Sequence, residues 1–94
     1  MDKLQKVREL IKKGQLNEAL LTLANHIVSA TVTGSDRSEL YYLMGNAYRK
    51  MGQFDLAIHY YNLAKNENPE TPAVEALKML QRIMAFYDKN MFSH

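Results

Sequence analysis

Residues 38–69 read SELYYLMGNAYRKMGQFDLAIHYYNLAKNENP, and this stretch decides the fold. Its apolar residues recur at steps of three and four, which predicts two amphipathic helices. The first is expected from about Ser38 to Met51 and the second from about Phe54 to Asn66. Gly52 ends the first helix and Pro69 closes the second. So short a connection predicts an antiparallel helical hairpin. The inward faces are expected to carry Leu40, Tyr41, Met44, Ala47 and Tyr48, and Leu56, Ala57, Tyr60, Tyr61 and Ala64.

A second hairpin is predicted before this stretch. Apolar residues at Leu4, Val7, Leu10 and Ile11 mark one face of a first helix, which is rich in lysine and arginine. Gly14 ends that helix, and another amphipathic helix follows at once. Residues 29–37 lack the helical period, so we expect them to complete the second helix and then to form a loop.

Two start signals place the remaining helix boundaries. Asp36 and Glu39 have the spacing of a capping box, which predicts that the third helix begins after Asp36. Thr71 and Pro72 are typical of an N-cap followed by the first helical position, and a fifth helix is expected from there to about Lys89. The residues after Lys89 are expected to fray.

The two hairpins contain an internal repeat. Gly14-Gln15-Leu16 with Ala19 matches Gly52-Gln53-Phe54 with Ala57, at an interval of 38 residues. In both copies a glycine ends one helix and a small alanine follows where two helices cross closely. Intervals of this length are typical of helical repeat arrays.

The second copy resembles a tetratricopeptide repeat, a helix–turn–helix unit of about 34 residues. With Ser38 as the first position, the matching residues are Tyr41, Met44, Gly45, Tyr48, Gly52, Ala57, Tyr61, Ala64 and Pro69. The first copy departs from the pattern at Val7, where a glycine is usual, and at His26, where an alanine is usual. The resemblance implies an all-α fold, in which two hairpins stack in a right-handed superhelix and a fifth helix caps the stack. We expect one domain over 1–94, with a degenerate repeat at 1–33, a second repeat at 38–71 and the capping helix at 72–90.

Composition excludes several classes of function. The chain has no cysteine, and its three histidines have no partner at metal-ligand spacing, so we expect no metal and no cofactor. Phosphate-binding loops and nucleophile motifs are missing from the sequence, which argues against an enzyme. It also contains neither a signal peptide nor an apolar run long enough to span a bilayer, and we expect a cytoplasmic protein. A net charge of +2 makes nucleic-acid binding a minor alternative.

The resemblance also implies a function, because tetratricopeptide repeats are scaffolds that bind peptides or proteins in a concave groove. By position, the groove here would be lined by Gln5, Arg8, Lys12, Tyr42, Asn46, Arg49 and Lys50. Such a basic lining favours an acidic peptide or a terminal carboxylate. The carboxylate clamp of chaperone-binding members is absent, because apolar residues such as Leu43 and Leu77 stand at its positions.

The fifth helix offers an alternative interface. Its apolar residues cover about half of its circumference, more than docking on one hairpin should use. The residues in excess of that need are Met79, Phe86, Met91 and Phe92. Exposed apolar patches tend to mark interfaces, so a homodimer or a partner interface at this helix is the second hypothesis.

Overall fold

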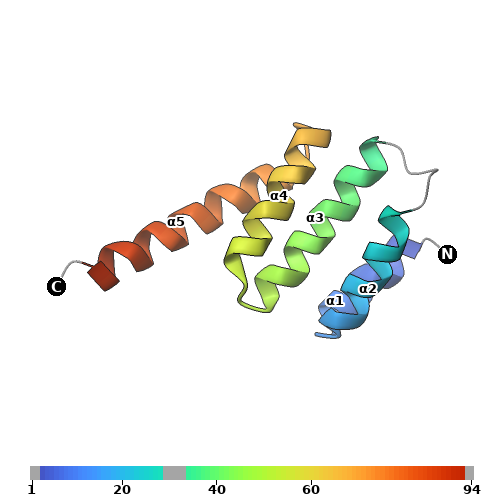
Figure 1. The fold of residues 1–94 in the computed structure, drawn as a ribbon, viewed down its shortest axis with the longest axis horizontal. Helices are drawn as coiled ribbons and strands as arrows, with labels where there is room; N and C mark the ends of the chain where they lie inside the picture. Colours follow the sequence, from blue (N-terminus) through green and yellow to red (C-terminus); the bar gives the residue numbers. More distant parts are fainter. Residues whose placement is uncertain (1–2, 29–33, 93–94) are drawn as a thin grey trace.

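The computed structural model describes the backbone of residues 3–28 and 34–92, and the side chains of residues 4–28 and 36–86. Five helices and no strand occur in these ranges: α1 (Lys3–Lys12), α2 (Leu16–Ile27), α3 (Gly34–Lys50), α4 (Phe54–Glu67) and α5 (Ala73–Phe92). This confirms the all-α fold and the number of helices. In Figure 1, α1 and α2 lie beside α3, α4 lies on the other side of α3, and α5 reaches away from α4. The molecule is accordingly elongated, with dimensions of 51 × 28 × 18 Å.

The two hairpin turns have the same structure, as the repeated glycines predict. Gly14 and Gly52 adopt φ values of +83° and +79°, a left-handed conformation that favours glycine. The amide of Gly14 donates to the carbonyl of Ile11, and the next amide donates to the carbonyl of Leu10. The same two hydrogen bonds recur after α3, and this pattern satisfies the free carbonyls at the end of each helix.

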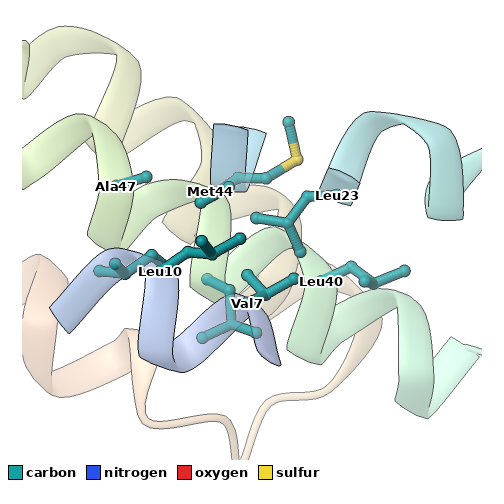
Figure 2. Close-up of a cluster of buried hydrophobic side chains, with 9 residues drawn as sticks. Val7, Leu10, Leu23, Leu40, Met44 and Ala47 are labelled. Carbon is teal, nitrogen blue, oxygen red and sulfur yellow. The ribbon is translucent and has the colours of Figure 1, made fainter. Parts of the chain in front are cut away.

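The core consists of two clusters that meet at α3. Figure 2 shows part of the first, in which buried side chains gather between α1, α2 and α3: Val7, Leu10, Leu23, Leu40, Met44 and Ala47. The second joins α4 to the first half of α5 through Ala57, Tyr61, Ala64, Ala73, Leu77 and Leu80. Tyr41 and Tyr42 of α3 pack against both clusters, so α3 connects the two halves of the molecule.

Helices α3 and α4 approach each other closely at Gly45. A Cβ atom there would lie 2.5 Å from two ring carbons of Tyr61, so the aromatic ring rests directly on the backbone of α3. Nearer the start of α3, the buried hydroxyl of Ser38 donates to the carbonyl oxygen of Ala64 at 2.9 Å. The contact with the Tyr61 ring explains why a glycine is needed at position 45.

The structure corrects the predicted start of α3. This helix begins at Gly34, four residues before the expected Ser38, and Asp36 lies inside its first turn rather than acting as a cap. Glu39 does not complete a capping box, because its carboxylate pairs with Arg8. Residues 34–37 of the predicted loop are therefore helical, and residues 29–33 lie outside the described ranges.

Other boundaries agree more closely with prediction. The Thr71 hydroxyl accepts a hydrogen bond from the amide of Ala73 at 3.3 Å, which confirms it as the cap of α5. Helix α5 continues to Phe92, beyond the expected end near Lys89. Two residues differ from the expected inward faces. Leu43 is buried although it was not included, and Leu56 is exposed although it was.

Candidate partner-binding face

Helices α1 and α3 run in the same direction and are joined by two polar contacts. From the middle of α1, Arg8 Nη2 lies 2.8 Å from Glu39 Oε1 in the first half of α3. Near their ends, Lys50 Nζ of α3 donates to the carbonyl oxygen of Ile11 at 3.3 Å. These two contacts hold α1 against α3, and we call the surface of the two helices that carries the predicted residues the α1–α3 face. It comprises Gln5, Arg8, Lys12, Tyr42, Asn46, Arg49 and Lys50.

Three of these residues gather around Tyr61 of α4. The Tyr61 hydroxyl donates to Asn46 Oδ1 and accepts a hydrogen bond from Arg49 Nε at 3.2 Å. The ring of Tyr42 lies against that of Tyr61, with 5.9 Å between the ring centroids. Because Tyr61 is fully buried, these contacts hold the side chains of α3 in fixed positions. Asn46 and Arg49 still have hydrogen-bond donors that Tyr61 does not use. These are the amide nitrogen of Asn46 and the two Nη groups of Arg49.

The environment of Tyr61 also changes its ionisation. Burial is the largest effect and raises the pKa of its phenol, because the charged form would lose its hydration. The hydrogen bond and the positive charge of Arg49 act in the opposite direction, and Tyr42 adds to the rise. Tyr61 therefore stays neutral at physiological pH, and its hydroxyl can donate a hydrogen bond to Asn46 Oδ1.

Positive charge is unevenly distributed over the α1–α3 face. The charge of Arg8, in the middle of α1, is offset by its ion pair with Glu39, and Arg8 also lies 3.5 Å from Gln5 Oε1. Lys12 is exposed at the other end of α1, near the carbonyl that binds Lys50. Arg49 precedes Lys50 in the last turn of α3. The face is basic at the end where α1 and α3 terminate.

Sequence reasoning missed two residues of this face. Glu39 lies three residues before Tyr42, so the steps that placed Tyr42, Asn46 and Arg49 on one side also place Glu39 there. Its spacing from Asp36 had suggested a cap instead. Tyr61 was correctly assigned to the core, but its hydroxyl belongs to the polar network. The tyrosine hydroxyl was the available signal, because a buried hydroxyl requires a partner.

The second predicted surface lies on α5. Met79 and Phe86 are 37% and 64% exposed, and with Arg82 and Ile83 they line a shallow hollow of about 470 Å³. The side chains of Met91 and Phe92 lie outside the described ones. These observations place part of the predicted apolar surface at the solvent.

No metal-binding group was found in the described ranges, where no three His, Cys, Asp or Glu side chains come together. His26 is half-buried, and the exposed His59 packs edge-on against Tyr60, with 5.0 Å between ring centroids. A membrane-crossing helix is also missing from this part of the chain, since none of its helices combines sufficient length with sufficient apolar character.

Comparison with known proteins agrees with the repeat. The model of the tetratricopeptide repeat matches residues 38–70, which is the α3–α4 hairpin except for the first turn of α3. A protein of Bacteroides fragilis, BF1650, whose structure was solved by NMR in solution, is similar over 98% of this chain and 90% of its own. The two share 41% sequence identity, and their structures superpose with a TM-score of 0.85. No curated protein matches the chain.

Proposed function

Because the chain belongs to the tetratricopeptide repeat family, whose members are typically non-catalytic scaffolds for protein–protein interaction, we propose that it captures an acidic peptide segment on the α1–α3 face. The observation that carries this proposal is the set of donors fixed at the basic end of the face. Arg49 and Asn46 are both held by the buried Tyr61 hydroxyl, so little side-chain entropy remains to be lost on binding.

The donors on this face suit an extended peptide with carboxylate groups. The two Nη groups of Arg49 have the forked geometry that matches a carboxylate. The amide nitrogen of Asn46 can donate to a peptide carbonyl, and Tyr42 offers an aromatic surface to an apolar side chain. Lys12, which is exposed, adds a positive charge that attracts acidic segments from a distance.

A peptide selection tests this function and requires no particular partner. The protein is used to select binders from a random peptide library displayed on phage, and the recovered sequences are compared with the starting library. We expect enrichment of Asp and Glu, together with affinity that falls as ionic strength rises. Enrichment of basic or purely apolar peptides, or affinity independent of salt, would contradict the proposal.

Matched charge variants locate the binding surface. Lys12→Glu and Arg49→Gln should each weaken a selected acidic peptide by about tenfold or more, because each removes a positive charge from the same end of the face. Lys65→Glu is the control, since it makes the same charge change as Lys12→Glu at an exposed position on α4. Equal losses in Lys12→Glu and Lys65→Glu would show that only net charge matters and would refute the α1–α3 face as the site.

A further inference from the structure

The binding residues of α3 stand at fixed intervals along the helix. Tyr42, Asn46 and Arg49 follow one another at steps of four and three residues, so they share one side of α3. At 1.5 Å per residue, Asn46 lies about 6 Å and Arg49 about 10.5 Å beyond Tyr42 along the helix axis. Asn46 and Arg49 both bind the hydroxyl of the buried Tyr61, which fixes their positions before a ligand binds. A ligand that uses all three residues must match this spacing.

The orientation of the Asn46 amide follows from the same network. Arg49 Nε can only donate to the Tyr61 hydroxyl, so that hydroxyl needs a separate acceptor for its own hydrogen. The acceptor is Asn46 Oδ1, which places the amide oxygen against Tyr61 and leaves the amide nitrogen on the other side. The nitrogen has no hydrogen-bond partner in the described part of the chain, and it is accessible to solvent. Asn46 therefore offers an outward-facing donor between Tyr42 and Arg49.

This donor distinguishes between the conformations that a bound peptide could adopt. An α-helical ligand also spans about 10.5 Å, in seven residues, but its interior carbonyls are already bonded within the helix. A polyproline II segment has three residues per turn, a rise of about 3.1 Å per residue and no internal hydrogen bonds. Residues three positions apart therefore lie on one side of it at about 9 Å, and the carbonyls between them are available to Asn46. A β-strand places same-side residues at about 7 or 13 Å, and neither distance fits.

Charge decides which end of the face receives the acidic residue of the ligand. Arg49 lies at the basic end, where α1 and α3 terminate. In the other direction, three residues before Tyr42, stands Glu39, whose carboxylate pairs with Arg8. A ligand carboxylate is therefore favoured at Arg49 over the opposite end. The apolar residue of the ligand then lies on Tyr42, whose half-buried ring already packs on that of Tyr61.

We propose that the ligand is a polyproline II segment in which an apolar residue and an Asp or Glu stand three positions apart. The apolar side chain packs on the ring of Tyr42, and the carboxylate accepts hydrogen bonds from the two Nη groups of Arg49. A carbonyl between them accepts one from the Asn46 amide. This inference rests on the proposed function, because it specifies which acidic peptide the α1–α3 face captures. It also fails separately, since acidic peptides that bind at any spacing contradict the motif and leave the function intact.

A series of synthetic peptides measures the spacing. Each peptide has a single Leu and a single Glu, from one to seven positions apart and in both orders, in a neutral background of Ser and Gln with blocked termini. We expect a spacing of three to bind tightest in one of the two orders, by about threefold to tenfold over two or four. Tightest binding at two or four would indicate a β-strand, and at seven a helix, and either result would overturn the proposal. Binding that requires Glu at any spacing would also overturn it, whereas binding that does not require Glu would refute the proposed function itself.

Double-mutant cycles between protein and peptide assign the apolar contact. Replacing Leu by Ser in the tightest peptide should weaken binding to the native chain by about fivefold, and should hardly change binding to Tyr42→Gln. Tyr48→Gln is the matched control, because Tyr48 is another half-buried tyrosine of α3 and stacks on Tyr60 instead. This control should retain the full effect of the Leu. An equal effect in Tyr42→Gln and the native chain would overturn the proposal, and circular dichroism verifies that both variants are folded.

Discussion

The two hairpins of this chain solve the same packing problem with different residues. In α3–α4, the bare backbone of Gly45 receives the large ring of Tyr61. At the equivalent places in α1–α2, 38 residues earlier, stand Val7 and Leu23, which are both buried in the first cluster. The first hairpin thus has a side chain of medium size on each helix, whereas the second has no side chain on one helix and a large ring on the other. The first hairpin is therefore a repacked repeat, and the glycine of the repeat pattern is required only where the facing residue is aromatic.

The largest effect is expected from placing the valine of the first hairpin into the second. Gly45→Val puts a side chain within 3 Å of the Tyr61 ring, which cannot withdraw easily because its hydroxyl is held by Asn46 and Arg49. We expect a loss of about 3 kcal/mol or more in the free energy of unfolding. Urea unfolding followed by circular dichroism measures this loss. A loss below about 1 kcal/mol would show that the helices separate readily, contrary to the comparison.

Combining that change with Tyr61→Leu reproduces the residue pair of the first hairpin in the second. One explanation is that the two hairpins fill the helix crossing with the same total side-chain volume and differ only in how it is divided between the two helices. In that case the double variant should lose less stability than the sum of the losses in the two single variants. We expect a coupling free energy of about 1–3 kcal/mol, measured by a double-mutant cycle from the same unfolding curves. Strictly additive losses would mean that the hairpins are not interchangeable at this crossing.

A smaller effect is expected from Tyr61→Phe, which keeps the ring and removes the hydroxyl. Asn46 and Arg49 then lose a partner in a partly buried place, and we expect a cost of about 1–2 kcal/mol in thermal unfolding. Tyr48→Phe is the matched control, because Tyr48 stacks on Tyr60 through its ring, and its hydroxyl makes no hydrogen bond within the described part of the chain. The control should change stability by less than about 0.5 kcal/mol.

The Tyr61 hydroxyl also makes the free energy of unfolding depend on pH in the alkaline range. Burial raises the pKa of Tyr61 above its ordinary value of 10.0, and burial followed by Tyr48 and Tyr41 raises that of Tyr60. The folded state therefore favours the neutral phenols. Their contribution is complete below pH 10.0 and is lost as pH rises through the folded-state pKa. Stability should fall above pH 10.0, and less steeply in Tyr61→Phe. Identical pH profiles for the two proteins would contradict this assignment.

The smallest effect concerns the contact between the hairpins. Arg8 and Glu39 are 40% and 31% exposed, and exposed ion pairs contribute at most about 1 kcal/mol. We expect Glu39→Gln to change the free energy of unfolding by less than about 0.5 kcal/mol. It should nevertheless strengthen binding of a selected acidic peptide, because the substitution removes a negative charge from the α1–α3 face. An unchanged affinity would show that the part of the face around Glu39 lies outside the binding site.

Helical period and turn glycines were enough to predict five helices and two identical turns, and Thr71 before Pro72 predicted the cap of α5. They failed where distant residues decide the local structure. The start of α3 was missed because Gly34, Ser35 and Asp36 have weak helix propensity. In the structure this turn is followed by an ion pair of Arg37 with Glu67 at 3.1 Å and by the hydrogen bond of Ser38, both to α4. The pairing of Arg8 with Glu39 was missed for the same reason, since it joins different hairpins.

The repeated turn has a consequence for how the chain folds. Each turn is closed by hydrogen bonds between residues three and five positions apart, so each hairpin can form before the other is present. Contacts this local cost little loop entropy, and folding within microseconds to milliseconds is the expectation for such a topology. Because the Tyr61 ring locks α4 onto α3, the α3–α4 hairpin is the expected nucleus. The α1–α2 hairpin would then condense on a surface that already exists.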